Sequence, residues 1–165
     1  MTPRRLAILG PPLAALGALA AISAAAPSLA LVNESPSLPK GLYVRAAGAA
    51  PEPGAVVAFA QPADARPYLA ALGVPADVSL LKRVAGRGGH LVCAERERVA
   101  LPGRWAPAMS HDRRGVALPR WRACRALADD EVFLLGDSAE SFDSRYFGPV
   151  RRADLDGVYR EVLTW

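Results

Sequence analysis

Residues 80–94, LLKRVAGRGGHLVCA, contain two short apolar runs, 80–85 and 90–94, separated by a cluster of glycines. Runs of this length that are bounded by turn residues are typical of β-strands joined by tight connections. Further apolar or alternating runs of the same kind occupy residues 41–45, 55–60, 99–101, 132–135 and 158–163. The sequence therefore predicts a mostly β domain.

One helix and one long loop complete the predicted domain. Residues 63–72 are expected to form the helix, because Tyr68, Leu69 and Leu72 share one face and a glycine and a proline follow as stop signals. Residues 103–120, rich in Arg, Pro and Gly, are expected to form an exposed loop. A chain of 165 residues has room for one such domain and a short extra element.

The extra element is an uncharged run from Leu6 to Val32, preceded by Arg4 and Arg5. As a helix, this run would span roughly 40 Å, more than the hydrocarbon core of a bilayer, which is about 30 Å thick. Arginines before the run, with no equal cluster after it, favour a cytoplasmic N-terminus. We therefore expect a single membrane anchor over residues 1–32 and an extracytoplasmic domain over residues 33–165.

A cleavable secretory signal is the alternative for the N-terminal run. The run is rich in alanine, residues 23–26 (SAAA) offer small side chains at the spacing of a cleavage site, and Pro11 and Pro12 would kink a spanning helix. Both interpretations place the rest of the chain across the membrane.

Two cysteines, Cys93 and Cys124, are present in the sequence. An exported domain meets an oxidising compartment, which favours a disulfide between them, and two buried free thiols are the alternative. The two histidines stand alone and no CxxC spacing occurs, so we expect neither a metal nor a cofactor.

The net charge is +4, and 18 of the 20 basic residues are arginine. A positive balance can favour anionic lipid surfaces. The basic residues are scattered without a cluster of interleaved aromatic residues, so nucleic acid is not an expected partner.

Residues 33–43, NESPSLPKGLY, place Ser37 a few positions beyond the apolar run and between Pro36 and Pro39. Proline fixes its own φ and restricts the residue before it, so this serine would lie on a stiff, extended backbone. Taken alone, the segment is typical of a linker leaving a membrane.

Lys82 lies inside an apolar run of a chain that otherwise uses arginine, apart from Lys40. A desolvated lysine can lose its proton, whereas arginine stays charged in proteins, so Lys82 is a candidate general base. A lysine at a strand edge that reaches solvent is the alternative.

Residues 136–148, GDSAESFDSRYFG, follow a predicted strand. Short polar side chains of this kind can hold a loop by hydrogen bonds to its backbone, and Asp143 and Arg145 suggest a structural ion pair. The alternative is an ordinary β-turn with polar side chains.

Together, the three segments resemble bacterial type I signal peptidases, and more closely the TraF-type peptidases of conjugative transfer. In that family a membrane anchor is followed at once by a serine box, then by a lysine box and a Gly-Asp…Ser-x-Asp-Ser-Arg box. The matching residues here are 35–39, 82–84 and 136–145. Residues 37–43 (SLPKGLY), 118–124 (LPRWRAC) and 132–137 (VFLLGD) are similar to the conjugative branch, and the resemblance extends from residue 33 to about 150.

Two departures from the family pattern lie in loops. Gly88-Gly89-His90 replaces the usual Pro-Gly-Asp, and Ser138 stands where asparagine is common. Neither departure changes Ser37 or Lys82.

The resemblance implies a signal-peptidase or LexA-like β-fold and a role for each of four residues. Ser37 would attack the scissile carbonyl with neutral Lys82 as general base, a variant of the serine-protease triad. Ser141 would orient the lysine amine, and the Ser37 amide with the Ser35 hydroxyl would form the oxyanion hole.

The implied enzyme is a single-pass inner-membrane serine endopeptidase, with its catalytic domain on the periplasmic side and bilayer lipid around its anchor. It would cleave the signal peptide or propeptide of an exported protein, such as a conjugative pilin. We expect shallow apolar pockets lined partly by residues 56–59, with the substrate adding as a β-strand.

The alternatives are a housekeeping signal peptidase, a non-catalytic envelope domain that binds a partner, and a self-cleaving LexA-like regulator. The apolar run, in place of a DNA-binding domain, argues against the last of these.

Overall fold

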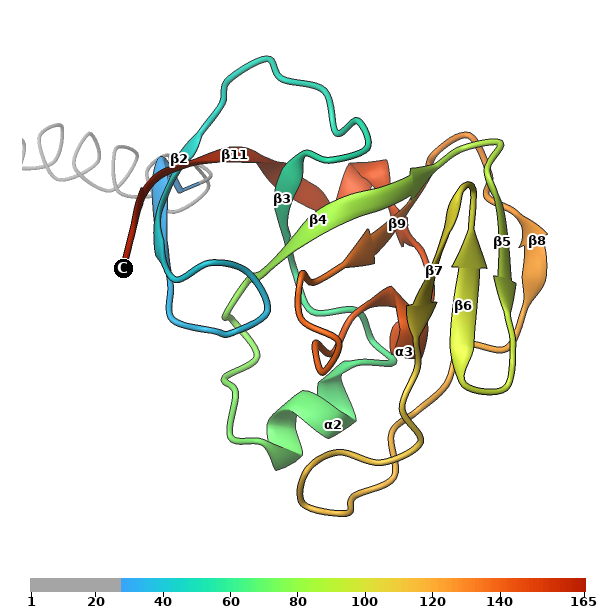
Figure 1. Ribbon diagram of the computed structural model, residues 1–165. Coiled ribbons are helices and arrows are strands. Elements are labelled where there is room, and N and C mark those ends of the chain that lie inside the picture. The colour runs from blue at the N-terminus through green and yellow to red at the C-terminus, as the bar shows by residue number, and fades with distance from the viewer. Residues whose placement is uncertain (1–27) are drawn as a thin grey trace, which may run out of the picture.

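The computed structural model describes residues 28–165, which form two antiparallel β-sheets (Figure 1). The larger sheet has the order β1–β2–β11–β3–β4–β9–β10, and the smaller sheet has the order β7–β6–β5–β8. The strands of the larger sheet are β1 (Ala30–Asn33), β2 (Gly41–Arg45), β11 (Leu155–Thr164), β3 (Val56–Phe59), β4 (Leu80–Arg87), β9 (Glu131–Leu135) and β10 (Val150–Arg151). Those of the smaller sheet are β7 (Arg104–Pro107), β6 (Arg98–Leu101), β5 (Leu91–Ala94) and β8 (Cys124–Ala126).

Two short α-helices and one turn of 3-10 helix complete the structure. They are α2 (Arg66–Ala71), α3 (Ser144–Phe147) and η1 (Arg152–Asp154). All the apolar runs that predicted strands do form strands, and α2 lies within the predicted helical segment, so the prediction of a mostly β domain is confirmed.

Two clusters of the core lie on opposite faces of β9, because successive side chains of a strand point to opposite faces of the sheet. Val132 and Leu134 pack in the cluster that also contains Leu69 of α2. Phe133 and Leu135 pack in the cluster that contains the inner face of the smaller sheet. Strand β9 is therefore buried between α2 on one side and the smaller sheet on the other.

Strand β4 changes partners along its length. Residues 80–83 pair with β3, whereas pairing with β9 begins only at Arg83 and continues to Arg87. The edge of β4 at residues 80–82 therefore has no strand partner on the β9 side in the part of the chain described.

The predicted anchor over residues 1–32 requires one correction. Ala30, Leu31 and Val32 belong to β1, because they pair with Val44, Tyr43 and Leu42 of β2 rather than continuing a helix. Residues 1–27 of the predicted anchor lie outside the described residues. Among residues 28–165, no helix is both long enough and apolar enough to cross a membrane.

The predicted exposed loop at residues 103–120 is also only partly correct. Its first residues form β7, which pairs with β6. Four other short elements, β8, β10, α3 and η1, have no counterpart in the sequence prediction.

A disulfide joins Cys93 of β5 to Cys124 of β8, as predicted for an oxidising compartment. The two cysteines are direct partners in the antiparallel pair, so the bond holds the three-residue strand β8 to the smaller sheet.

Candidate active site

The loop between β1 and β2 carries Ser37 and is held by one buried asparagine. The side-chain amide of Asn33 donates hydrogen bonds to the carbonyl oxygens of Ser35 (2.9 Å), Leu38 (3.1 Å) and Pro39 (3.0 Å). Its oxygen accepts a hydrogen bond from the Ser35 amide. The Asn33 side chain therefore provides hydrogen-bond partners for backbone groups of this tight loop.

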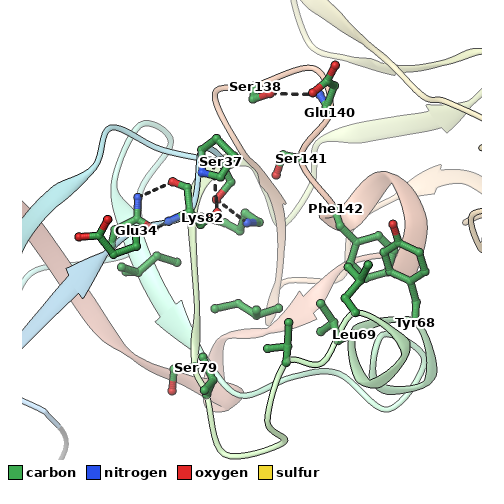
Figure 2. Close-up of a pocket in the computed structure, with 18 of the residues that line it drawn as sticks. Glu34, Ser37, Tyr68, Leu69, Ser79, Lys82, Ser138, Glu140, Ser141 and Phe142 are labelled. Carbon is green, nitrogen blue, oxygen red and sulfur yellow. Dashed lines mark hydrogen bonds between the residues drawn. The ribbon is translucent and has the colours of Figure 1, made fainter. Parts of the chain in front are cut away.

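Ser37 and Lys82 meet at this loop. Lys82 lies in β4, and its Nζ donates a hydrogen bond of 2.9 Å to Ser37 Oγ (Figure 2). Both residues are only 5% exposed. The two residues are 45 positions apart in the sequence, so the contact depends on the packing of the serine loop against β4.

Burial makes the Lys82 amine a weaker base than a lysine in water. Desolvation of the ammonium lowers the pKa of Lys82 to about 8, Arg145 acts in the same direction, and Asp143 opposes them. A group with this pKa is unprotonated in about one molecule in ten at pH 7. Lys82 can therefore accept a proton at neutral pH.

The Ser35 hydroxyl forms hydrogen bonds with both the side chain and the backbone amide of Ser37. It donates a hydrogen bond of 2.8 Å to Ser37 Oγ and accepts one of 3.2 Å from the Ser37 amide. The two groups predicted to form the oxyanion hole are therefore adjacent, and they bond to one another.

The loop from Gly136 to Asp143 follows β9 and brings Ser141 to the same pocket as Ser37. The Ser141 hydroxyl is buried and has no hydrogen-bond partner within residues 28–165. A close approach at Gly136 makes this arrangement possible, since a side chain there would place its Cβ 2.8 Å from the Ser37 carbonyl oxygen. That carbonyl accepts a hydrogen bond from the Asp137 amide (2.7 Å).

A buried ion pair between Asp143 and Arg145 holds this loop. Two nitrogens of Arg145 donate to the two carboxylate oxygens of Asp143, each at 2.7 Å. Arg145 also donates to the carbonyl oxygens of Pro107, Ser138, Ala139 and Ser141. These hydrogen bonds let the Arg145 guanidinium cross-link the loop, although burying a charge costs free energy.

The pocket beside Ser37 has a volume of about 870 Å³. Its walls come from the β1 segment, the start of β4, α2, the loop after β7 and the loop after β9. Figure 2 shows Leu69, Tyr68 and Phe142 at the end of the pocket opposite Glu34. The expected contribution of Val56–Phe59 is wrong, because β3 lies between β11 and β4 and its side chains are buried in the core.

The loop after β7 supplies a wall that the sequence did not identify. The Tyr68 hydroxyl donates to Asp112 (3.0 Å), the Met109 amide donates to the Tyr146 hydroxyl (3.1 Å), and Arg113 forms an ion pair with Glu140. Asn33 was missed as well, although an asparagine at the entry to a loop rich in serine and proline is a signal for side-chain bonding to the backbone.

Within the described residues, no group of three His, Cys, Asp or Glu side chains could hold a metal ion.

Comparison with known proteins gives three results. Residues 5–165 match the sequence model of the family described as signal peptidase, peptidase S26. Two relatives from Escherichia coli, each named plasmid transfer protein TraF, are 37% and 35% identical over 149 residues, which are 82% of this chain and 84% and 83% of theirs. The crystal structure of a signal peptidase I from Enterococcus faecalis V583 shares 23% identity, with a TM-score of 0.41 over 67% of this chain and 97% of that one.

Proposed function

The chain belongs to the signal peptidase family, peptidase S26, and on that premise we propose that it is a membrane-anchored serine endopeptidase with a Ser37–Lys82 dyad. The hydrogen bond of 2.9 Å between Lys82 Nζ and Ser37 Oγ is the observation that carries this proposal. A domain that only binds a partner would have no need for a buried amine against a hydroxyl, since burying that amine costs stability.

The proposed reaction proceeds through an acyl-enzyme. Neutral Lys82 accepts the Ser37 proton as Oγ attacks the scissile carbonyl, and the resulting ammonium protonates the leaving amine. An ester on Ser37 and the released C-terminal product remain. Water then attacks the ester with Lys82 again as base, which frees the N-terminal product and restores the Ser37 hydroxyl.

The oxyanion that forms during each attack requires donors. We assign this role to the Ser37 amide and the Ser35 hydroxyl, which would exchange their mutual hydrogen bond for bonds to the substrate oxygen. Removal of one such donor typically lowers the rate about 100- to 1000-fold. Ser141, whose buried hydroxyl has no partner in the described structure, would orient the Lys82 amine.

Two strand edges beside the pocket support binding of an extended substrate. β1 is the outermost strand of its sheet, and β4 has no partner on the β9 side at residues 80–82. Residues of both segments line the pocket. A peptide could therefore add as a β-strand at β1 or β4, rather than near β3.

We propose that the substrate is a precursor of the conjugation apparatus, such as a pilin subunit that carries a signal peptide or propeptide. The support is the identity of 37% and 35% to two plasmid transfer proteins. A housekeeping signal peptidase is the alternative within the same family.

The proposed anchor ends before Ala30, where β1 begins, and the proposed periplasmic domain starts within a few residues of Ser28. This organisation places the nucleophile close to the outer face of the inner membrane, where a membrane-held precursor would present its cleavage site.

Four variants test the dyad. Ser37→Ala, Lys82→Ala and Lys82→Arg should each abolish cleavage of a membrane-inserted precursor, because the first lacks the nucleophile and the others lack a base. Lys40→Ala is the matched control, since Lys40 is the other lysine of the chain and its side chain is 47% exposed. Near-normal cleavage by Lys82→Arg would remove the general-base assignment.

A further inference from the structure

A second pocket, of about 320 Å³, lies against the loop that follows β9. Ser138 lines both this pocket and the one that contains Ser37. The other walls come from β7, Arg83 of β4 and the residues 135–139. The volume is near the lower end of the range for small-ligand sites, which is enough for one side chain.

The second pocket is directly connected to the residue proposed as nucleophile. The Asp137 amide, in its wall, donates to the Ser37 carbonyl oxygen at 2.7 Å, while the Ser37 hydroxyl faces the first pocket. The two pockets therefore adjoin one another beside Ser37.

The second pocket carries an excess of positive charge. Arg83 is neutralised by two hydrogen bonds to Asp137 (2.9 and 2.8 Å), and Arg145 is neutralised by Asp143. Arg104 is exposed and makes no side-chain hydrogen bond or ion pair within residues 28–165, although its charge is close enough to Asp137 to contribute to the lowered pKa of that carboxyl, after the larger effect of the hydrogen bonds from Arg83. Its neighbour Trp105, which is 62% exposed, adds an apolar wall with a donor N–H.

The surrounding segment reinforces this charge. Residues 86–128 contain nine arginines and only three acidic residues. A field of one sign draws oppositely charged groups toward a cleft, so the approach of an acidic peptide segment to this side of the molecule is favoured.

We propose that Arg104 and Trp105 form a specificity subsite for an acidic side chain that follows the scissile bond of the substrate. This inference rests on the proposed function, because exported precursors carry small residues directly before the cut, and these residues suit the first pocket. The residues after the cut then lie over Ser138 and enter the second pocket. There the Arg104 guanidinium, which makes no hydrogen bond or ion pair within residues 28–165, pairs with the carboxylate.

The test uses peptides with one constant sequence before the cut. Each of the first four positions after the cut carries Glu, Gln or Lys in turn. For the full-length enzyme, Glu at one position should raise kcat/KM about fivefold over Gln, mainly through KM, which corresponds to the upper end for a partly exposed ion pair. Arg104→Gln should remove this preference, and Arg104→Glu should reverse it in favour of Lys.

Arg122→Gln is the matched control, since Arg122 is an exposed arginine outside both pockets. It should leave the preference unchanged. An unchanged Glu-to-Gln ratio in Arg104→Gln, or no preference for Glu at any position, would overturn the subsite while cleavage of the Gln peptides still supported the protease. Failure of the wild-type enzyme to cleave any peptide would overturn the proposed function and the subsite together.

Discussion

The pH dependence of cleavage is the sharpest consequence of the buried lysine. The pKa of Lys82 falls from 10.5 to about 8, chiefly because burial destabilises the ammonium. At pH 7 an ordinary lysine with the higher pKa would be neutral in about 0.03% of molecules, compared with about 9% at a pKa of 8. Burial therefore raises the fraction of neutral Lys82 about 300-fold.

The expected profile follows from this titration. Below pH 7, kcat/KM should rise about tenfold for each pH unit, and it should level off near the pKa of Lys82. Protonated Lys82 cannot accept the Ser37 proton, so the sign is loss of activity as pH falls. The measurement is the initial rate of precursor cleavage in detergent, at substrate concentrations well below KM, between pH 5 and pH 10.

Two results would refute this reasoning. A rate that stays flat from pH 6 to pH 9 would show that no group with a pKa near 8 controls the reaction. A rate that still rises above pH 10 would show that the amine titrates like a lysine in water, so that burial does not tune it. A midpoint of the pH profile near 8 would also distinguish Lys82 from an ordinary histidine, whose pKa is about 6.5.

Two further predictions concern the parts that hold the site. Asn33→Ala and Asn33→Asp should both lower the melting temperature and the cleavage rate, because either change leaves the carbonyl oxygens of Ser35 and Leu38 in the serine loop without a donor, at a cost of at least about 2 kcal/mol. Wild-type stability of Asn33→Asp in thermal unfolding would show that the amide donors are unimportant. Replacement of both Cys93 and Cys124 by serine should destabilise the domain by about 2–4 kcal/mol and raise KM more than it lowers kcat, because the freed segment includes the pocket wall from Met109 to Leu118. An unchanged KM in steady-state kinetics would contradict the proposed link to the pocket wall.

The sequence predicted the strands that carry alternating or compact apolar runs, since this pattern reflects the burial of the strand itself. It did not predict β1, because Ala30 to Val32 continue a uniformly apolar run and only their pairing with β2 distinguishes them from a helix. It did not predict β7 or β8 either. Both lie in segments rich in arginine, and what fixes them is pairing with β6 and β5 rather than their own composition.

The same distinction applies to the site. Ser37 and Lys82 stood out because their residue types are unusual in their surroundings, a serine between prolines and a lysine in an arginine-rich chain. Arg104 had no such signal, since it is one of 18 arginines. Its lack of a partner becomes visible only when the neighbouring arginines are seen to be paired with Asp137 and Asp143.

The architecture also reconciles two opposed needs of the proposed lysine base. The amine must be dry to be neutral, yet β4 must keep an edge open for the substrate at residues 80–82. The serine loop provides part of the solution, because Ser37 covers the Lys82 amine and accepts its hydrogen bond. A peptide lying along the open edge would exclude the remaining water and disfavour the ammonium further. The pH midpoint of kcat, which reports the enzyme–substrate complex, should therefore lie below that of kcat/KM, which reports the free enzyme. If the two midpoints coincided, substrate binding would not desolvate the Lys82 amine further. The serine loop alone would then account for its burial.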